Sequence, residues 1–474
     1  MSPGWVFLTI ALYFLMLVGI SFLVGRKSDN ATFFLGNKKS PWFVVAFGMI
    51  GASLSGVTFI SVPGWVDGAE FSYMQMVLGY LAGYAVIALV LMPLYYRLNL
   101  VSIYQYLESR FGRKSYLTGS GFFLLSRTIG ASFRLFLVAN VLQITLFNAL
   151  NIPFWVTVMV TILLIWLYTF RSGIRTIVFT DTLQTLFMLL AVGIAIVTIQ
   201  NKMGLSFTGL VDTIETSPYS KWFFWEDWGS QKHFVRQFFS GMFITIVMTG
   251  LDQDMMQKNL TCHNIKDAQK NMLWFSVILV VVNLCFLSLG ALLYLYAGQS
   301  GIQATGDDLF AVVATQGDLG MVLGIFFILG LIAAAYSSAD SALTSLTTAF
   351  CVDFLRVQMK SSSTAIRDRK MVHVGFSVLL FLVILVFSMI KDENVISALF
   401  RAAGYTYGPL LGLYSFGLLT KRKVLDDYVP FICLASPIIW YLLNLQFPET
   451  FGFELLIYNG ATTFLGLFLI SRSK

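Results

Sequence analysis

Long apolar stretches separated by short polar segments follow one another along the whole chain. Thirteen of them are long enough to cross about 30 Å of hydrocarbon as a helix. They lie at 5–24, 41–65, 72–96, 116–147, 153–170, 178–200, 237–257, 271–298, 319–353, 373–390, 396–420, 427–446 and 453–472. Because thirteen is odd, the two ends of the chain are expected on opposite sides of a membrane. The pattern predicts an all-α polytopic membrane protein.

The composition supports this prediction. Of the 474 residues, 57% are hydrophobic and 12% are charged, whereas soluble domains carry about 25% charged residues. So little charge excludes a soluble enzyme, a disordered protein and a coiled coil. We therefore expect the lipid bilayer, not a nucleic acid, as the partner of this chain, despite its net charge of +7. The expected location is the cell membrane, which would be the inner membrane in a Gram-negative bacterium.

Motifs for metal binding or catalysis are missing from the sequence. The four cysteines show no C-x-x-C spacing, which argues against a disulfide framework or a zinc site. Neither an H-E-x-x-H nor a G-x-S-x-G motif occurs. No catalytic constellation is recognisable, so an enzyme is not expected.

Basic residues are distributed unequally between alternate loops. One set of loops, with the C-terminal end, holds 23 lysines and arginines, and the other set holds 5. Cytoplasmic loops are the ones enriched in basic residues, which predicts an outside N-terminus and an inside C-terminus. The remaining three, Arg127, Arg134 and Arg401, lie within predicted spans.

Two of the predicted spans have interrupted middles. Residues 48–58 of the second span are dense in glycine and hydroxyl side chains, and 240–254 of the seventh are similar and end in Asp252-Gln253-Asp254. Such residues could merely allow close helix packing. Their matching places, five spans apart, favour broken helices that line a midplane cavity in two inverted repeats.

These breaks predict the organisation of the chain as a single transmembrane domain. An extra helix at 5–24 precedes a first repeat at 41–200, a second repeat covers 237–420, and two extra helices occupy 427–472.

The ninth span carries a polar stripe on one helix face, formed by hydroxyl residues. Its members are Ser337, Ser338, Ser341, Thr344 and Ser345. Asp340 lies among them, and a carboxylate inside a membrane needs a cavity, a cation or a partner. Oxygen ligands of this kind suit a hard cation. The alternative, that the serines only hydrogen-bond to their own helix, explains the aspartate less well. Asp181, near the start of the sixth span, is either a helix-start residue or a functional one.

Together these segments resemble the sodium/solute symporter family. The resemblance rests on residues 33–65, on Ser172-Gly173-Ile174-Arg175-Thr176 with Thr180-Asp181, on Gly250-Leu251-Asp252-Gln253 through Gln257-Lys258, on Ser337-Ser338, and on Tyr407-Gly408-Pro409-Leu410-Leu411-Gly412. It implies the leucine-transporter fold and a symporter that imports a small organic solute by alternating access. It also implies sodium as the coupling ion, one or two per cycle, and function as a single protomer.

The resemblance also implies a sodium site between the break in the second span and the ninth span. Its ligands would be the carbonyls of Gly51, Leu54 and Ala334 and the hydroxyls of Ser337 and Ser338. A candidate second cation site would comprise Asp181, Asp340 and Ser341. Asp340 stands where a hydroxyl is expected, which leaves sodium and a proton as alternatives there.

Candidate substrate residues follow from the sialic acid and sugar branches of the family. They are Ser53, Ser55, Thr58, Phe71, Gln75, Thr245, Met248, Arg134 and Arg401. Arg401 occupies a place that contacts sugar in the sugar branch, and a guanidinium suits a carboxylate. These residues favour an anionic solute. The alternatives are a proton-coupled carrier of the same fold and a symporter of a neutral sugar or polyol. An ion channel is not favoured because a filter motif such as T-V-G-Y-G is missing.

The loop charges give a first prediction. Cysteines introduced within 358–368 should react only with reagents that reach the cytoplasm, and cysteines within 205–215 should react with impermeant reagents from outside. The measurement is labelling of intact cells. The reverse pattern would contradict the inverted-repeat assignment.

Overall fold

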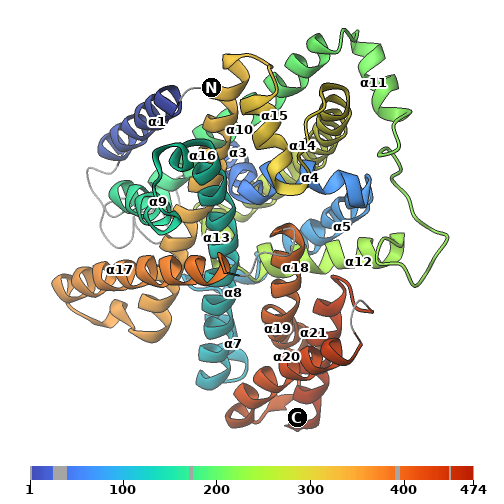
Figure 1. The fold of residues 1–474 in the computed structure, drawn as a ribbon. Coiled ribbons are helices and arrows are strands. Elements are labelled where there is room, and N and C mark those ends of the chain that lie inside the picture. Colours follow the sequence, from blue (N-terminus) through green and yellow to red (C-terminus); the bar gives the residue numbers. More distant parts are fainter. Residues whose placement is uncertain (1–2, 25–39, 170–173, 390–394, 448–449, 473–474) are drawn as a thin grey trace.

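The computed structural model describes residues 3–24, 40–169, 174–389, 395–447 and 450–472. The described chain is almost entirely helical, and the helices pack into a bundle (Figure 1). The all-α architecture is thereby confirmed. Parts of two segments on which the family resemblance rests, 33–39 and 172–173, lie outside the described residues.

The helices of the first half run from α1 to α10. They are α1 (Pro3–Val24), α3 (Trp42–Ser53), α4 (Gly56–Ala69), α5 (Tyr73–Val86), α6 (Met92–Arg97), α7 (Gln105–Arg110), α8 (Arg113–Leu142), α9 (Phe154–Thr169) and α10 (Ile174–Lys202). A short π-helical segment, Ile87–Leu91, joins α5 to α6.

The second half begins after α11 (Phe207–Glu215), which lies in the long loop between the halves. It contains α12 (Phe234–Thr245), α13 (Gln253–Asn259), α14 (Ile265–Ser300), α15 (Leu309–Gln316), α16 (Met321–Ala349), α17 (Ser362–Phe387), α18 (Val395–Thr406), α19 (Gly408–Leu419), α20 (Val429–Gln446) and α21 (Leu455–Leu469). Two short strands, β1 (Lys423–Val424) and β2 (Ser471–Arg472), pair antiparallel beside the C-terminus.

Each of the thirteen predicted spans coincides with one helix or with consecutive helices. Among the described residues, seven helices are long and apolar enough to cross a membrane, and two bent helix pairs raise this number to nine. The apolar parts of α1, α9, α19 and α21 are shorter than these seven helices. The count of thirteen and the sidedness of the termini stay predictions.

Apolar side chains face outward on the peripheral helices. On α20, Phe431, Ile438 and Leu442 are more than half exposed. A soluble protein would bury such residues, whereas hydrocarbon is a favourable environment for them. The outer faces of these helices therefore suit contact with lipid.

Both predicted interruptions are breaks in the structure. α3 and α4 meet at a bend of 54°, where Leu54 and Ser55 leave helical geometry. The segment α12, extended by a π-helical turn at Ile246–Gly250, meets α13 at a bend of 68°. Asp252 begins α13 as its N-cap, since its carboxylate accepts from the backbone NH of Asp254 (2.9 Å) and of Met255 (3.4 Å).

Glycines allow the broken helix α3 to lie directly against α10. A Cβ on Gly51 would overlap the hydroxyl of Thr185, and one on Gly48 would meet the carbonyl of Val178 at 3.0 Å. Thr185 in turn donates to the carbonyl of Phe47 at 3.0 Å. α10 also packs along α16, so α3, α10 and α16 form one contiguous unit beside the first break.

The helices outside the two predicted repeats lie at the periphery. α1 packs against α9, α10 and α16, whereas α20 and α21 pack with α18 and α19 on the opposite side of the bundle (Figure 1). Near the C-terminus, the carboxylate of Asp426 accepts from the backbone NH of Lys114 and Ser115 at 2.9 and 2.8 Å. This contact caps α8 from a distant part of the chain.

The contact between α5 and α12 gives a second prediction. Gly79 and Gly241 lie where a Cβ would overlap the backbone of Phe238 and of Met76, respectively. Gly79→Leu should therefore lower the melting temperature of the purified protein, because the two helices would have to separate. Gly193→Leu is the control, since nothing lies within 4 Å of a Cβ at that position. Equal melting temperatures for both variants would contradict the close packing.

Candidate substrate and cation sites

A cavity that is partly open to solvent lies beside both breaks. The break between α3 and α4, the segment leading to the second break, and the helices α5, α8, α14 and α18 all contribute to its wall. Five predicted substrate residues on the two broken helices line it: Ser53, Ser55, Thr58, Thr245 and Met248. The structure thus brings together residues that are almost 200 positions apart in the chain.

Further polar groups complete the cavity wall. Tyr73, Tyr80 and Tyr84 extend along α5, and Asn283 enters from α14. The hydroxyls of Tyr73 and Tyr80 lie 3.0 Å apart and hydrogen-bond to each other. None of these residues was predicted from the sequence as a site residue. The spacing of the tyrosines, i, i+7 and i+11, places them on one helix face and was a usable signal.

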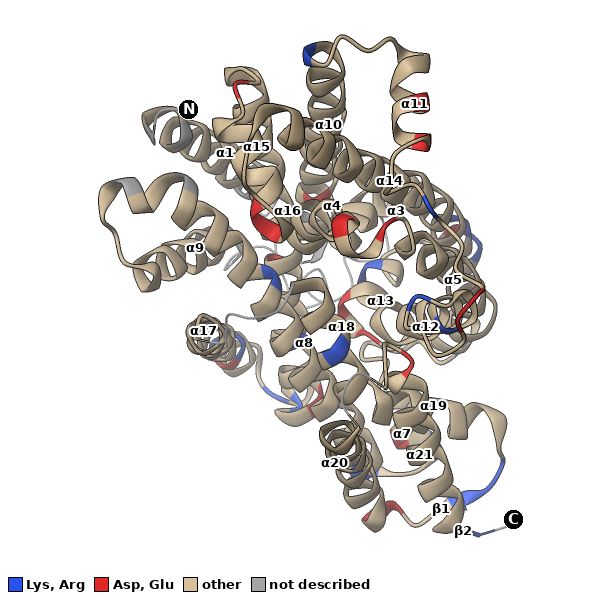
Figure 2. Cartoon of the chain, turned by 45° about the vertical axis from the view of Figure 1, so that its right-hand side comes forward, with Lys and Arg blue, Asp and Glu red and all other residues tan. Residues whose placement is uncertain are grey.

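A buried ion-pair network adjoins the cavity. Arg127 on α8 lines the cavity and pairs with Asp254 on α13, with Asp252 at 4.0 Å. The hydroxyl of Tyr407 donates to Asp252 at 2.6 Å. These contacts connect α8, α13 and the junction between α18 and α19 at the second break. Buried charges inside the bundle are visible near α8 and α13 in Figure 2.

Arg134 lies two helical turns beyond Arg127 on α8 and also lines the cavity. Its side chain is 8% exposed. Within the described part of the chain it forms no ion pair, and its Nε has no hydrogen-bond partner. The carboxylates of Asp252 and Asp254 act on it only at longer range, since they pair with Arg127. Arg134 is thus a buried cation that faces an open space.

Phe71 and Gln75 do not line the cavity. The side chain of Gln75 donates to the carbonyl of Lys232 at 2.9 Å and accepts from the NH of Phe224 at 3.1 Å. Phe71 packs against Trp222 with ring centroids 6.3 Å apart. Both residues therefore hold the long loop between the halves against the start of α5.

Arg401 also lies apart from the cavity. It is exposed, and it lines a separate pocket between α18, α20 and α21, together with Tyr405, Asn444 and Phe453. Of the two arginines proposed from the sequence as ligands for an anion, the structure places only Arg134 beside the breaks.

The predicted sodium ligands lie on α3, at its C-terminal end and on α16, and these two helices contact each other. Gly51, Leu54, Ala334, Ser337 and Ser338 are all buried. The hydroxyl of Ser338 has no hydrogen-bond partner among the described residues, and the same holds for Ser341 and Thr344 on α16. Buried hydroxyls normally find partners, so these oxygens are suited to a bound cation.

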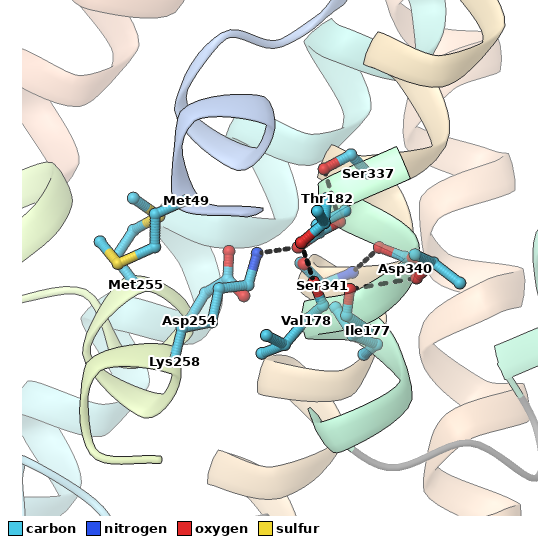
Figure 3. Close-up of polar contacts among 12 residues, drawn as sticks. Met49, Ile177, Val178, Thr182, Asp254, Met255, Lys258, Ser337, Asp340 and Ser341 are labelled. Carbon is cyan, nitrogen blue, oxygen red and sulfur yellow. Dashed lines mark hydrogen bonds and ion pairs between the residues drawn. The ribbon is translucent and has the colours of Figure 1, made fainter. Parts of the chain in front are cut away.

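The carboxylate of Asp181 is engaged on both sides. Its Oδ2 lies 2.7 Å from the Nζ of Lys258, and its Oδ1 accepts from the hydroxyl of Ser337 at 2.6 Å. Lys258 is 1% exposed. Figure 3 shows its ammonium pointing from α13 toward the helix that carries Ser337 and Ser341. Lys258 belongs to a motif that carries the family resemblance but was not predicted as a site residue, because its partner is 77 residues away in the chain.

Asp340 is fully buried on α16, one residue before Ser341. Its carboxylate accepts from the backbone NH of Ser341 at 2.5 Å, so it is turned along its own helix (Figure 3). The three residues of the candidate second cation site, Asp181, Asp340 and Ser341, thus come from the neighbouring helices α10 and α16.

Comparison with known proteins assigns the family. The model of the sodium:solute symporter family matches residues 33–424. The chain belongs to the sodium:solute symporter family. This match covers all the segments that line the cavity and the polar cluster on α16. The family is one of transporters, so the expectation that the chain is not an enzyme is confirmed, as are its membrane location and sodium as the coupling ion.

Several characterised proteins are similar over most of their length. The sodium/sialic acid symporter SiaT of Proteus mirabilis is 25% identical and covers 86% of this chain and 83% of its own. The human sodium/iodide cotransporter is 24% identical over 88% of this chain and 66% of its own.

Solved structures show the same fold. A sodium-coupled sialic acid symporter in a substrate-bound, outward-open state matches with a TM-score of 0.84 and 18% identity, over 99% of both chains. Mhp1, a nucleobase-cation-symport-1 family transporter, matches with a TM-score of 0.58 and 13% identity, over 93% and 94% of the two chains. The leucine-transporter fold expected from the sequence is thereby confirmed.

The ion-pair network gives a third prediction. Arg127→Met would leave the buried carboxylate of Asp254 without its cation, and breaking such a pair costs about 3–5 kcal/mol. The variant should therefore melt at a clearly lower temperature than the wild type. The double variant Arg127→Met, Asp254→Asn should recover part of the loss.

Lys202→Met serves as the control for this prediction. Lys202 pairs with Asp318 at 3.1 Å, but both side chains are exposed, and exposed pairs contribute little. An equal effect of Arg127→Met and Lys202→Met on the melting temperature would show that the network does not stabilise the bundle.

Proposed function

We propose that this symporter imports a small organic anion together with sodium. The observation that carries the proposal is the guanidinium of Arg134, which is buried, faces the cavity and pairs with no described carboxylate. An arginine inside a membrane costs about 2.5–3.5 kcal/mol on insertion scales. A transported anion would compensate that charge in the loaded state.

The comparison of Arg127 with Arg134 supports this role. Both arginines lie on the same face of α8, yet only Arg127 has a protein carboxylate as its partner. A planar guanidinium binds a carboxylate through two parallel hydrogen bonds. Arg134 is therefore the group in the cavity that distinguishes an acidic solute from a neutral one.

The rest of the cavity wall indicates a solute with several hydroxyl groups. Ser53, Ser55 and Thr58 from the first break lie opposite Thr245 and Thr249 from the second, and Asn283 and three tyrosines add donors and acceptors. Sialic acids are the named solutes of two relatives. A carboxylated sugar or a related hydroxy acid combines these features, and a neutral sugar would leave Arg134 uncompensated.

Sodium is proposed to bind where the first break meets α16. The ligands would be the carbonyls of Gly51, Leu54 and Ala334 with the hydroxyls of Ser337 and Ser338. A hard cation prefers such oxygen ligands, and the unpartnered hydroxyl of Ser338 supports the assignment. Because the first break borders both this site and the cavity, a sodium ion there would order the segment that carries Ser53 and Ser55.

Transport would proceed by alternating access in one protomer within the bilayer. Each proposed repeat, 41–200 and 237–420, begins with a broken helix pair, and such breaks mark the binding region of transporters built from inverted repeats. Movement of the two repeats against each other would expose the cavity to either side in turn.

The anion proposal is tested with a matched pair of solutes. Purified protein is titrated with a sugar acid and with its amide, in sodium and in choline chloride, and binding is measured by thermal shift and calorimetry. The acid should bind in sodium, and the amide should bind at least tenfold more weakly, a difference of about 1.4 kcal/mol. Equal affinity for acid and amide would contradict the proposal.

Variants of the two candidate arginines complete this test. Arg134→Lys should weaken binding of the acid about tenfold or more, because lysine lacks the planar fork. Arg401→Lys is the control and should leave the affinity unchanged, since Arg401 lies in a separate pocket. A loss of affinity in Arg401→Lys alone would assign the anion to that pocket instead.

The sodium site gives a separate prediction. Ser338→Ala should raise the sodium concentration for half-maximal uptake about tenfold or more, because a hydrogen bond or ligand to a charged group contributes about 1.5–3 kcal/mol. Ser345→Ala on the same helix is the control, since its hydroxyl donates to the carbonyl of Ala342 at 3.0 Å. Unchanged sodium dependence in Ser338→Ala would contradict the assignment.

A further inference from the structure

Lys258 is a buried cation beside Asp181 on α10, which in turn contacts Ser337 on α16. Its Nζ lies 2.7 Å from the carboxylate of Asp181, and the Lys258 and Asp181 side chains are 1% and 0% exposed. The other oxygen of Asp181 accepts from Ser337 at 2.6 Å. Lys258 lies on α13, directly after the second break. The proposed sodium site includes the first break instead.

The oxygens around Asp181 would otherwise suit a metal cation. Ser341 and Thr344 follow on α16, and their hydroxyls are buried without hydrogen-bond partners among the described residues. A carboxylate with nearby hydroxyls is the kind of ligand set that a hard cation prefers. The ammonium of Lys258 supplies the same single positive charge to this carboxylate without leaving the protein.

Two cations at this carboxylate would exclude each other. An ammonium and a sodium ion a few ångströms apart repel strongly inside a protein, where little water screens them. The ammonium already contacts Asp181 Oδ2 at 2.7 Å. Asp340, the other carboxylate of the candidate site, is instead turned to the backbone NH of Ser341 on its own helix. A sodium ion could bind to Asp181 only if Lys258 moved away.

We propose that Lys258 is a tethered cation that takes the place of a second sodium ion at Asp181, so that this carrier binds one sodium ion. The inference rests on the proposed sodium site at the first break, which supplies that one ion. Lys258 thereby determines the ion stoichiometry of the carrier, although it does not line the cavity. Asp181 links it to the proposed sodium site, because the same carboxylate accepts from Ser337.

The position of Lys258 on α13 adds a structural consequence. α13 follows the second break and also carries Asp254, the partner of Arg127. Lys258 and Asp254 therefore hold the same short helix to α10 and to α8. A cation that displaced Lys258 would release α13 from α10, whereas the tethered ammonium keeps this contact without a second ion.

Sodium binding to purified protein in nanodiscs, measured with radioactive sodium and without any solute, tests the proposal. The wild type should bind one ion per chain. Lys258→Met keeps the length of the side chain but removes its charge, and this variant should bind two ions. Lys258→Arg keeps the charge and should still bind one. The double variant Lys258→Met, Asp181→Asn should return to one, because the second site then lacks its carboxylate.

Thermal stability provides a readout that is independent of the ion count. In Lys258→Met the buried carboxylate of Asp181 loses its cation, so sodium should raise the melting temperature of this variant more than that of the wild type or of Lys258→Arg. If Lys258→Met cannot be purified, Lys258→Gln, which also removes the charge, takes its place.

Two ions bound by the wild type would overturn the proposal, as would a single ion bound by a folded Lys258→Met. Failure of the proposed function would look different. In that case the wild type would bind no sodium, or sodium would bind without any effect of Ser338→Ala on its affinity.

Discussion

A charge buried inside a membrane protein must be compensated by a neighbour, and this constraint organises the centre of the molecule. Hydrocarbon and close-packed helices offer little solvation, so an uncompensated ion there is costly. Arg127 is compensated by Asp254, and Lys258 is compensated by Asp181. Arg134 has no such partner among the described residues. Of these three cations, it is the one that we propose binds the transported anion.

The two broken helices place these charges where they can act. Because Asp252 caps α13 and accepts from Tyr407, and Asp254 pairs with Arg127, the second break is held by side chains from two other parts of the chain. The first break instead lies between the cavity and the hydroxyls of α16. The proposed solute and sodium sites thus both include residues of the first break, which would meet the physical requirement for coupling one flow to the other.

Periodicity and glycine patterns predicted the architecture because they are local properties of the chain. The apolar stretches coincide with the helices, and the glycine-rich middles at 48–58 and 240–254 coincide with the two breaks. Residues on these breaks, such as Ser55 and Thr245, consequently lie beside the cavity as expected. The polar stripe on α16 also follows from spacing alone.

Pairings between distant helices could not be predicted in this way. The contact between Lys258 and Asp181 depends on how α13 packs against α10, which no local pattern encodes. The same holds for Gln75, whose amide holds the long loop. It holds too for Arg401, which was expected to contact the solute from its place in the sugar branch but lines a separate pocket. The places of individual site residues taken from the family resemblance were therefore less reliable than the places of whole segments predicted from their glycine and hydroxyl content.

The most direct test of the account is an experimental structure of the protein bound to an acidic sugar and sodium. The account predicts the carboxylate of the solute within hydrogen-bond distance of both terminal nitrogens of Arg134, and its hydroxyls against Ser55, Thr58 and Thr245. A solute bound in this cavity with its carboxylate away from Arg134, or paired with Arg401 in the separate pocket, would contradict it.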